Sequence, residues 1–330
     1  MTERNPNPTA GDDRCPCRRC PRNRRGVSDL EAFLRAPGFS GSVVDGPIDT
    51  VMAALPQLAN VVGVTAAGPV ITNDVGTHHP PETIDGPLRS VGDGLVLRIN
   101  PAALGTVLVT DPSASAPPTV RVFDTEGNSV HVTYLIEGSD RLAFESLSLS
   151  RSADVDILDD LALQRQQAQP TAAPEPTPEF ADDQIGLIDS ILVDGGVARG
   201  AALAATARSG FSRVSARRVI DALSYASTIA LPMTTATAAP GCLQIHHDVL
   251  TGAREHHGSM VIASDAARTM INFNSVAQCW VTTVDGAWGP TSAIEVYDRH
   301  GRCSFVASQT GPVNRWIYDA WEQLIADLVD

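Results

Sequence analysis

The hexapeptides Val-Phe-Asp-Thr-Glu-Gly at residues 122–127 and Val-Tyr-Asp-Arg-His-Gly at residues 296–301 are two versions of one motif, 174 positions apart (296 minus 122). Each joins the end of an apolar strand to an aspartate and a glycine, which is typical of a hairpin turn with a left-handed glycine. The same spacing aligns residues 68–132 with residues 242–306 without a gap. We therefore interpret the chain as an internal duplication.

The fold class follows from the pattern within each copy. Short β-branched runs alternate with Gly, Pro, Asp and Asn from about residue 59 to 135 and again from about 229 to 306, which predicts an antiparallel meander in each copy. Helical periodicity precedes and follows both meanders. The sequence thus predicts an α+β fold with two tandem similar domains, each an antiparallel β-sheet (meander) packed with helices.

The last predicted helix carries one apolar stripe that we expect to pack on the sheet as core. The stripe consists of Trp316, Ile317, Ala320, Trp321, Leu324, Ile325 and Leu328.

Composition sets the predicted domain boundaries. Residues 1–26 are rich in Pro, Arg and Asp without periodicity, which predicts a disordered basic tail; it contains Cys15, Cys17 and Cys20. A structural zinc site needs four ligands, and no nearby His or Cys completes these three, so exposed thiols are the favoured interpretation over a metal site. Residues 27–168 form the first repeat, the Pro-rich stretch 169–182 a linker, and residues 183–330 the second repeat.

Charge and missing motifs exclude several classes of function. The formal net charge of −14 argues against a nucleic-acid partner. All 24 basic residues are arginine, which excludes Schiff-base lysines and phosphate-binding loops that need a lysine. No apolar run reaches the ~20 residues of a membrane span, so we expect a cytoplasmic protein without membrane insertion. The lysine-free, arginine-rich composition suggests a bacterial source, and no common catalytic motif is present, so no catalytic residue is assigned.

Histidine pairs are the strongest candidates for a binding site. His246 and His247 lie in a predicted strand, where neighbouring side chains face opposite sides of the sheet. His256 and His257 lie in a predicted loop only ten residues later (256 minus 246), so we expect the two pairs to meet at one end of the sheet. Imidazole suits iron and zinc, and His256 with His257 is the predicted metal site. The alternative is a pair of solvated loop histidines.

Three stretches of the second half resemble the motifs of a known family. Gly-Cys-Leu-Gln-Ile-His at 241–246, Ala-Gln-Cys-Trp-Val-Thr at 277–282 and the hairpin at 291–301 resemble motifs of the HemS/ChuS (ChuX-like) family of cytoplasmic haem-trafficking and haemin-degrading proteins. The resemblance implies haem as the ligand and a role in bacterial iron and haem uptake, by haem transfer or haemin degradation. It also implies a haem transporter or an electron-donor protein as partner.

The resemblance has gaps at the family's haem-contacting positions. Gly186 stands where such proteins place an iron-ligating histidine, and residues 306–310 contain neither the family's Tyr nor its Arg. Under this resemblance the axial ligand is relocated to His256 or His257, with His246 in the same patch. Arg254 or Arg98 would contact the haem propionates. The alternative function is a non-enzymatic paralogue that keeps the fold, has lost haem and acts as an interaction or metal-binding protein; whether the chain is an enzyme stays open.

Overall fold

The computed structural model describes residues 27–88, 94–113, 116–149, 183–205, 210–310 and 313–329. The predicted tail and linker therefore lie outside the described residues. The first repeat contains α1 (Asp29–Leu34), β1 (Gly41–Val43), α2 (Ile48–Ala54), β2 (Ala59–Ala67), β3 (Val70–Thr77), β4 (Glu82–Thr83), β5 (Val96–Ile99), β6 (Leu104–Thr110), β7 (Thr119–Asp124), β8 (Ser129–Ser139) and α3 (Arg141–Leu149).

The second repeat has a matching series of elements. These are α5 (Gln184–Asp194), α6 (Val197–Ala205), β9 (Ser212–Val214), α7 (Ala216–Thr228), β10 (Pro232–Ala239), β11 (Cys242–Val249), β12 (Gly252–His256), β13 (Ser259–Ala263), β14 (Ala267–Asn272), β15 (Val276–Gly286), β16 (Gly289–Asp298), β17 (Cys303–Ser308) and α8 (Arg315–Val329). Asp183 caps α5 by accepting a hydrogen bond from the Gly186 backbone, and Gly195 ends the helix in a left-handed conformation, as the sequence predicts.

The strands form two sheets, and each sheet takes strands from both repeats. The nine-stranded sheet has the order β1-β6-β7-β8-β2-β3-β14-β13-β12, and the eight-stranded sheet has the order β4-β5-β11-β10-β17-β16-β15-β9. The predicted antiparallel α+β fold is confirmed, and parallel pairing between named strands is confined to β4 and β5 in the described residues. Strands β4 and β5 of the first repeat join the sheet of the second, and strands β12–β14 of the second repeat join the sheet of the first. The sheets therefore do not mark where one repeat ends and the other begins, and the repeat boundaries stay a prediction.

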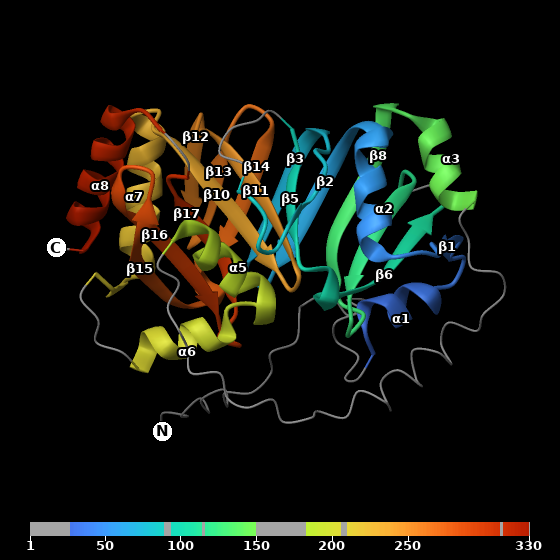
Figure 1. The fold of residues 1–330 in the computed structure, drawn as a ribbon, viewed down its shortest axis with the longest axis horizontal. Coiled ribbons are helices and arrows are strands. Elements are labelled where there is room, and N and C mark those ends of the chain that lie inside the picture. Colours follow the sequence, from blue (N-terminus) through green and yellow to red (C-terminus); the bar gives the residue numbers. More distant parts are fainter. Residues whose placement is uncertain are drawn as a thin grey trace, which may run out of the picture.

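Helices α2 and α3 share one core cluster with strands of both sheets, and helices α7 and α8 share another. α2 and α3 lie at the end formed by the first repeat, and α7 and α8 lie at the opposite end (Figure 1). α5 packs on the outer face of the eight-stranded sheet through Leu187, Ile188, Ile191 and Leu192. No helix among the described residues is long and apolar enough to cross a membrane.

The two repeats do not align without a gap. Asn100 and Asn272 cap equivalent short 3₁₀ helices and are 172 positions apart (272 minus 100). Asp124 and Asp298 accept equivalent backbone hydrogen bonds in the two hairpin turns and are 174 apart (298 minus 124). The second repeat therefore holds two extra residues between the 3₁₀ helix and the hairpin turn. The gapless alignment is wrong for the residues that precede this insertion.

The α8 stripe is confirmed except at its first residue. Trp321, Leu324, Ile325 and Leu328 are buried, whereas the Trp316 side chain is 63% exposed. At 100° per residue, Trp316 lies well to one side of the direction that these four share, so it points away from the core.

Candidate functional site

His246 and His247 face opposite sides of β11, as strand alternation predicts. The His246 ring bonds Asp74 Oδ2 through Nδ1 at 3.0 Å and Ser264 Oγ through Nε2 at 2.6 Å. This Asp-His-Ser chain resembles a catalytic triad, but Ser264 is only 2% exposed, and a nucleophile must be reached by its substrate. The contacts instead join β3, β11 and the β13–β14 turn.

The predicted four-histidine patch is wrong. His256 and His257 lie at the exposed β12–β13 turn, with ring centroids 4.1 Å apart. His246 contacts Ser264, which follows the other end of β13, and five residues of strand span roughly 13 Å. No group of three or more His, Cys, Asp or Glu in the described ranges could hold a metal ion. Arg254 is exposed on β12, and the His256–His257 pair stays a prediction.

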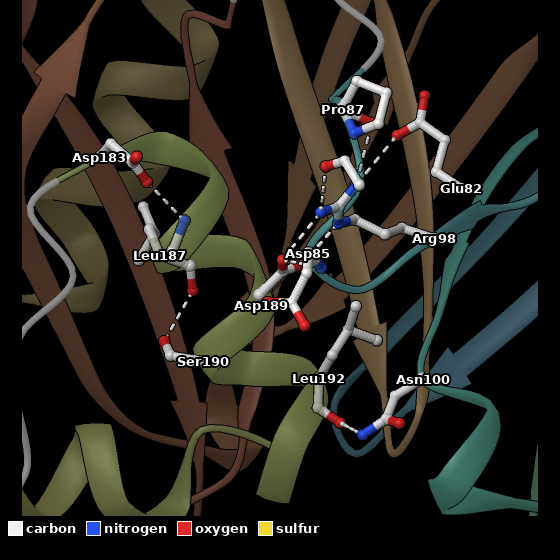
Figure 2. A network of polar contacts seen from close by, with 12 residues as sticks. Glu82, Asp85, Pro87, Arg98, Asn100, Asp183, Leu187, Asp189, Ser190 and Leu192 are labelled. Carbon is white, nitrogen blue, oxygen red and sulfur yellow. Dashed lines mark hydrogen bonds and ion pairs between the residues drawn. The ribbon is translucent and has the colours of Figure 1, made fainter.

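Arg98 does not contact an open site, so its predicted role at a propionate is not supported. Its side chain is fully buried in β5 and donates from Nε and Nη2 to the two carboxylate oxygens of Asp189 on α5, at 2.6 and 2.8 Å (Figure 2). Further donations go to the carbonyls of Gly86 and Pro87, and Glu82 lies 3.5 Å away. With its donors engaged, this arginine of the first repeat ties α5 of the second to the sheet.

A narrow cleft lies between the first turns of α5 and the eight-stranded sheet. Its apolar walls and hydroxyl or amide groups come from Gln184, Leu187, Ile188, Thr234, Ala236, Val306, Ser308 and Thr310. The free volume is about 10 Å³, which is the space of one water molecule. The Gln184 side-chain amide donates to the Gln309 carbonyl, and the buried Gln309 Oε1 has no hydrogen-bond partner among the described groups.

His247 stands beside this cleft. It pairs with Thr234 across β10 and β11, and its Nδ1 lies 2.6 Å from Thr234 Oγ1. Burial lowers the pKa of His247, and neighbouring His246 lowers it further, while Asp248 opposes the shift. The sequence led us to expect His246, and not His247, at the binding site. The sequence did contain a signal for His247. Leu243, Ile245 and His247 alternate along the strand and so share one face of the sheet, and the first two are core residues.

Two more histidines are buried in the first repeat. His131 Nδ1 bonds Thr65 Oγ1 at 2.9 Å, and His78 Nε2 bonds Thr133 Oγ1 at 2.9 Å. Burial lowers the pKa of His78 to about 4 and that of His131 well below its usual value. Both imidazoles are therefore neutral at pH 7 and serve as polar core residues.

A larger open groove of about 450 Å³ lies where turns of the two repeats meet. Its lining includes the β2–β3 turn at Gly68, the β10–β11 turn at Pro240, and His300 and Arg302 of the β16–β17 turn. Sequence reasoning did not select these two residues, because His300 belongs to the repeated turn motif and Arg302 directly follows it.

The fold and the cleft define a class: a duplicated α+β protein with two shared sheets and a helix closed over one of them. Residues 196–328 match the family model of the haemin-degrading HemS.ChuX domain. The structure is similar to apo-PhuS, a heme-binding protein from Pseudomonas aeruginosa, with TM-score 0.70, 18% identity and coverage of 92% of this chain and 91% of that chain. It is also similar to ChuS, an E. coli heme oxygenase, with TM-score 0.69, 17% identity and coverage of 91% and 92%.

Among curated proteins, no sequence matches this chain significantly. The predicted resemblance to the HemS/ChuS family is nevertheless confirmed, because residues 196–328 match the HemS.ChuX family model and over 90% of the chain shares the fold of PhuS and ChuS.

Proposed function

We propose that this chain binds haem in the cytoplasm of a bacterium and passes it on during haem and iron uptake. The observation that supports this most is the HemS.ChuX match over residues 196–328, which include the whole sheet wall of the α5 cleft. The likeness to heme-binding PhuS extends over 92% of the chain. The protein partner would be a haem transporter or a haem-accepting enzyme.

The residues of the cleft suit the chemistry of haem. Leu187, Ile188, Ala236 and Val306 would contact the apolar macrocycle. His247, whose Nδ1 lies 2.6 Å from the lining residue Thr234, supplies an imidazole next to the polar end of the cleft. Haem, when bound, supplies an iron centre that needs such an axial donor.

The cleft must open before it can admit a porphyrin. Ligand pockets usually have volumes of ~300–1,000 Å³, far above the free volume here. Arg98 holds α5 at Asp189, in the middle of the helix, so the mobile part under this proposal is the first turn around Gln184 and Leu187.

One observation favours the alternative of a paralogue that has lost haem. α5 has the sequence Gln-Ile-Gly-Leu-Ile-Asp-Ser-Ile-Leu-Val-Asp and offers no His, Tyr, Cys or Met to an iron. If another element does not supply the donor, the retained fold would serve as an interaction or metal-binding protein.

A haemin titration followed by visible absorbance tests the proposal. We expect a saturable one-to-one Soret change in the wild type. Ile188→Trp places a larger ring in the cleft and should abolish the change in a protein that circular dichroism shows to be folded, whereas Val193→Trp places the same ring on a 62% exposed position of the same helix and should not. Non-saturable binding by the wild type, or equal binding by both variants, would contradict haem binding in this cleft.

A further inference from the structure

We propose that the groove where turns of the two repeats meet binds a small zwitterion: a free amino acid with an aliphatic side chain. Asp298 and Ser304 accept hydrogen bonds from its ammonium group, and Arg302 pairs with its carboxylate. The groove has a volume of about 450 Å³, within the ~300–1,000 Å³ usual for small-molecule sites. Among the described residues its lining shares no member with that of the α5 cleft, so the proposal does not depend on haem binding.

The Asp298 carboxylate keeps one oxygen free at the floor of the groove. Its Oδ1 accepts hydrogen bonds from the backbone N–H groups of His300 at 2.7 Å and Arg302 at 3.0 Å, which fixes the β16–β17 turn. Its Oδ2 has no hydrogen-bond partner among the residues that the structure describes. Asp298 lines the groove although it is only 7% exposed. A carboxylate oxygen this far removed from water favours a ligand that donates to it and carries positive charge.

The equivalent turn of the first repeat satisfies its aspartate from within. Asp124 Oδ1 accepts the backbone N–H groups of Glu126 and Asn128, and the Asn128 side-chain amide donates to Oδ2 at 3.0 Å. Arg302 stands where the first repeat has Asn128, four residues after the aspartate. In this described turn its guanidinium makes no hydrogen bond to Asp298. The two repeats therefore differ in one respect: the second leaves its aspartate open to a ligand.

A second acceptor lies close to the free oxygen. Ser304 lines the groove, is 1% exposed, and its Oγ has no hydrogen-bond partner within the described ranges. A Cβ built on Gly68 in the β2–β3 turn would lie 3.0 Å from Asp298 Oδ2 and 3.1 Å from Ser304 Oγ. The two oxygens therefore converge beside this glycine. A primary ammonium group has three N–H donors and forms short bonds to carboxylates, so one such group can bridge both oxygens.

Arg302 supplies the opposite charge on the same lining. It is exposed, and its guanidinium has no partner in the part of the chain that the structure describes. The planar guanidinium matches a carboxylate with two parallel hydrogen bonds. Asp29, the other carboxylate of the lining, is already engaged by the Ser129 backbone N–H at 3.1 Å. The remaining lining includes apolar groups that suit an aliphatic side chain, from Val27, Ala66, Ala67, Ala238 and Pro240.

Isothermal titration calorimetry with three probes at pH 6.5 tests the proposal. L-leucine has both charged groups, N-acetyl-L-leucine lacks the ammonium group, and L-leucinamide lacks the carboxylate; free amino groups are protonated at this pH. We expect saturable one-to-one binding of L-leucine, binding of L-leucinamide weaker by about tenfold or more, and no detectable binding of N-acetyl-L-leucine.

Two asparagine variants assign the site. Asp298→Asn keeps the oxygen that accepts the turn N–H groups but replaces Oδ2 with a donor, so it should abolish L-leucine binding. Asp124→Asn is the matched change in the first repeat and should bind L-leucine as the wild type does. Circular dichroism and thermal melting confirm that both variants are folded.

Three results would overturn the proposal: no saturable binding of L-leucine, equal binding of its N-acetyl derivative, or binding that survives in Asp298→Asn. Each of them would leave the proposed haem binding standing, because the haemin titration uses a different ligand and a different part of the lining.

Discussion

Asp74 of β3 and His246 of β11 occupy the same position in the two repeats, and their side chains bond each other at 3.0 Å between Oδ2 and Nδ1. Their separation of 172 (246 minus 74) equals that of the capping residues Asn100 and Asn272. Thr72 and Thr237 also meet here, at 2.5 Å between their hydroxyl oxygens. The central hairpins of the two repeats therefore pack on each other through a polar contact, which joins the two sheets.

Removing one member of this central pair should destabilise the fold. His246→Phe leaves the fully buried Asp74 carboxylate without its imidazole partner, and we expect the free energy of unfolding to fall by about 1–3 kcal/mol. The double variant Asp74→Leu/His246→Phe should lose less than the sum of the two single losses. Urea denaturation measures all three, and strictly additive losses would show that the contact carries no coupling.

Removing one member of the Arg98–Asp189 pair should lower the free energy of unfolding more than replacing both members with apolar residues. Arg98→Met leaves a buried carboxylate on α5 without its cation, so we expect a loss of about 3–5 kcal/mol in the free energy of unfolding. Arg98→Met/Asp189→Leu removes both charges and should recover part of it. If urea denaturation shows the double variant to be no more stable than Arg98→Met, the ion pair does not hold α5 to the sheet.

Stability should fall in mild acid because two histidines are buried neutral. The folded pKa of His78 is lowered to about 4 and that of His131 lies well below its usual value, so the unfolded chain binds more protons below about pH 6.5. Each histidine then removes about 1.4 kcal/mol per pH unit as pH falls from about 6.5 toward 4.

His131→Gln isolates this effect, because glutamine does not titrate and can still bond Thr65. The variant should show a smaller slope of unfolding free energy against pH between 4.5 and 6.5, by about 1.4 kcal/mol per unit. An unchanged slope would mean that His131 does not titrate in this window on unfolding.

Alanine substitutions at two glycines distinguish the cost of backbone strain from the cost of a steric clash. Gly241 and Gly301 both have φ near +75°, but a Cβ at Gly241 would lie 2.8 Å from Ala103 Cβ of the other repeat, whereas nothing lies within 4 Å of one at Gly301. Gly301→Ala should lose roughly 1 kcal/mol through strain alone. Gly241→Ala should lose clearly more, and equal shifts in thermal unfolding would show that the repeats are not in tight contact at this turn.

Local signals in the sequence predicted much of the fold. The Asp124 and Asp298 turns, the Asp183 cap and the alternating strands depend on neighbouring residues, so each could be read without the tertiary structure. The sequence did not predict that β4–β5 and β12–β14 each join the sheet of the other repeat, because this arrangement pairs residues far apart in the chain. Arg98 likewise resembles any strand arginine until Asp189, 91 positions away, is placed against it.

The most direct test of the central claim is the position of iron in crystals of the haem complex, located by anomalous diffraction at the iron edge. We predict one iron peak between α5 and the eight-stranded sheet, with the first turn of α5 displaced. A peak at the His256–His257 turn, or in the groove beside His300, would contradict the assignment of the α5 cleft as the haem site.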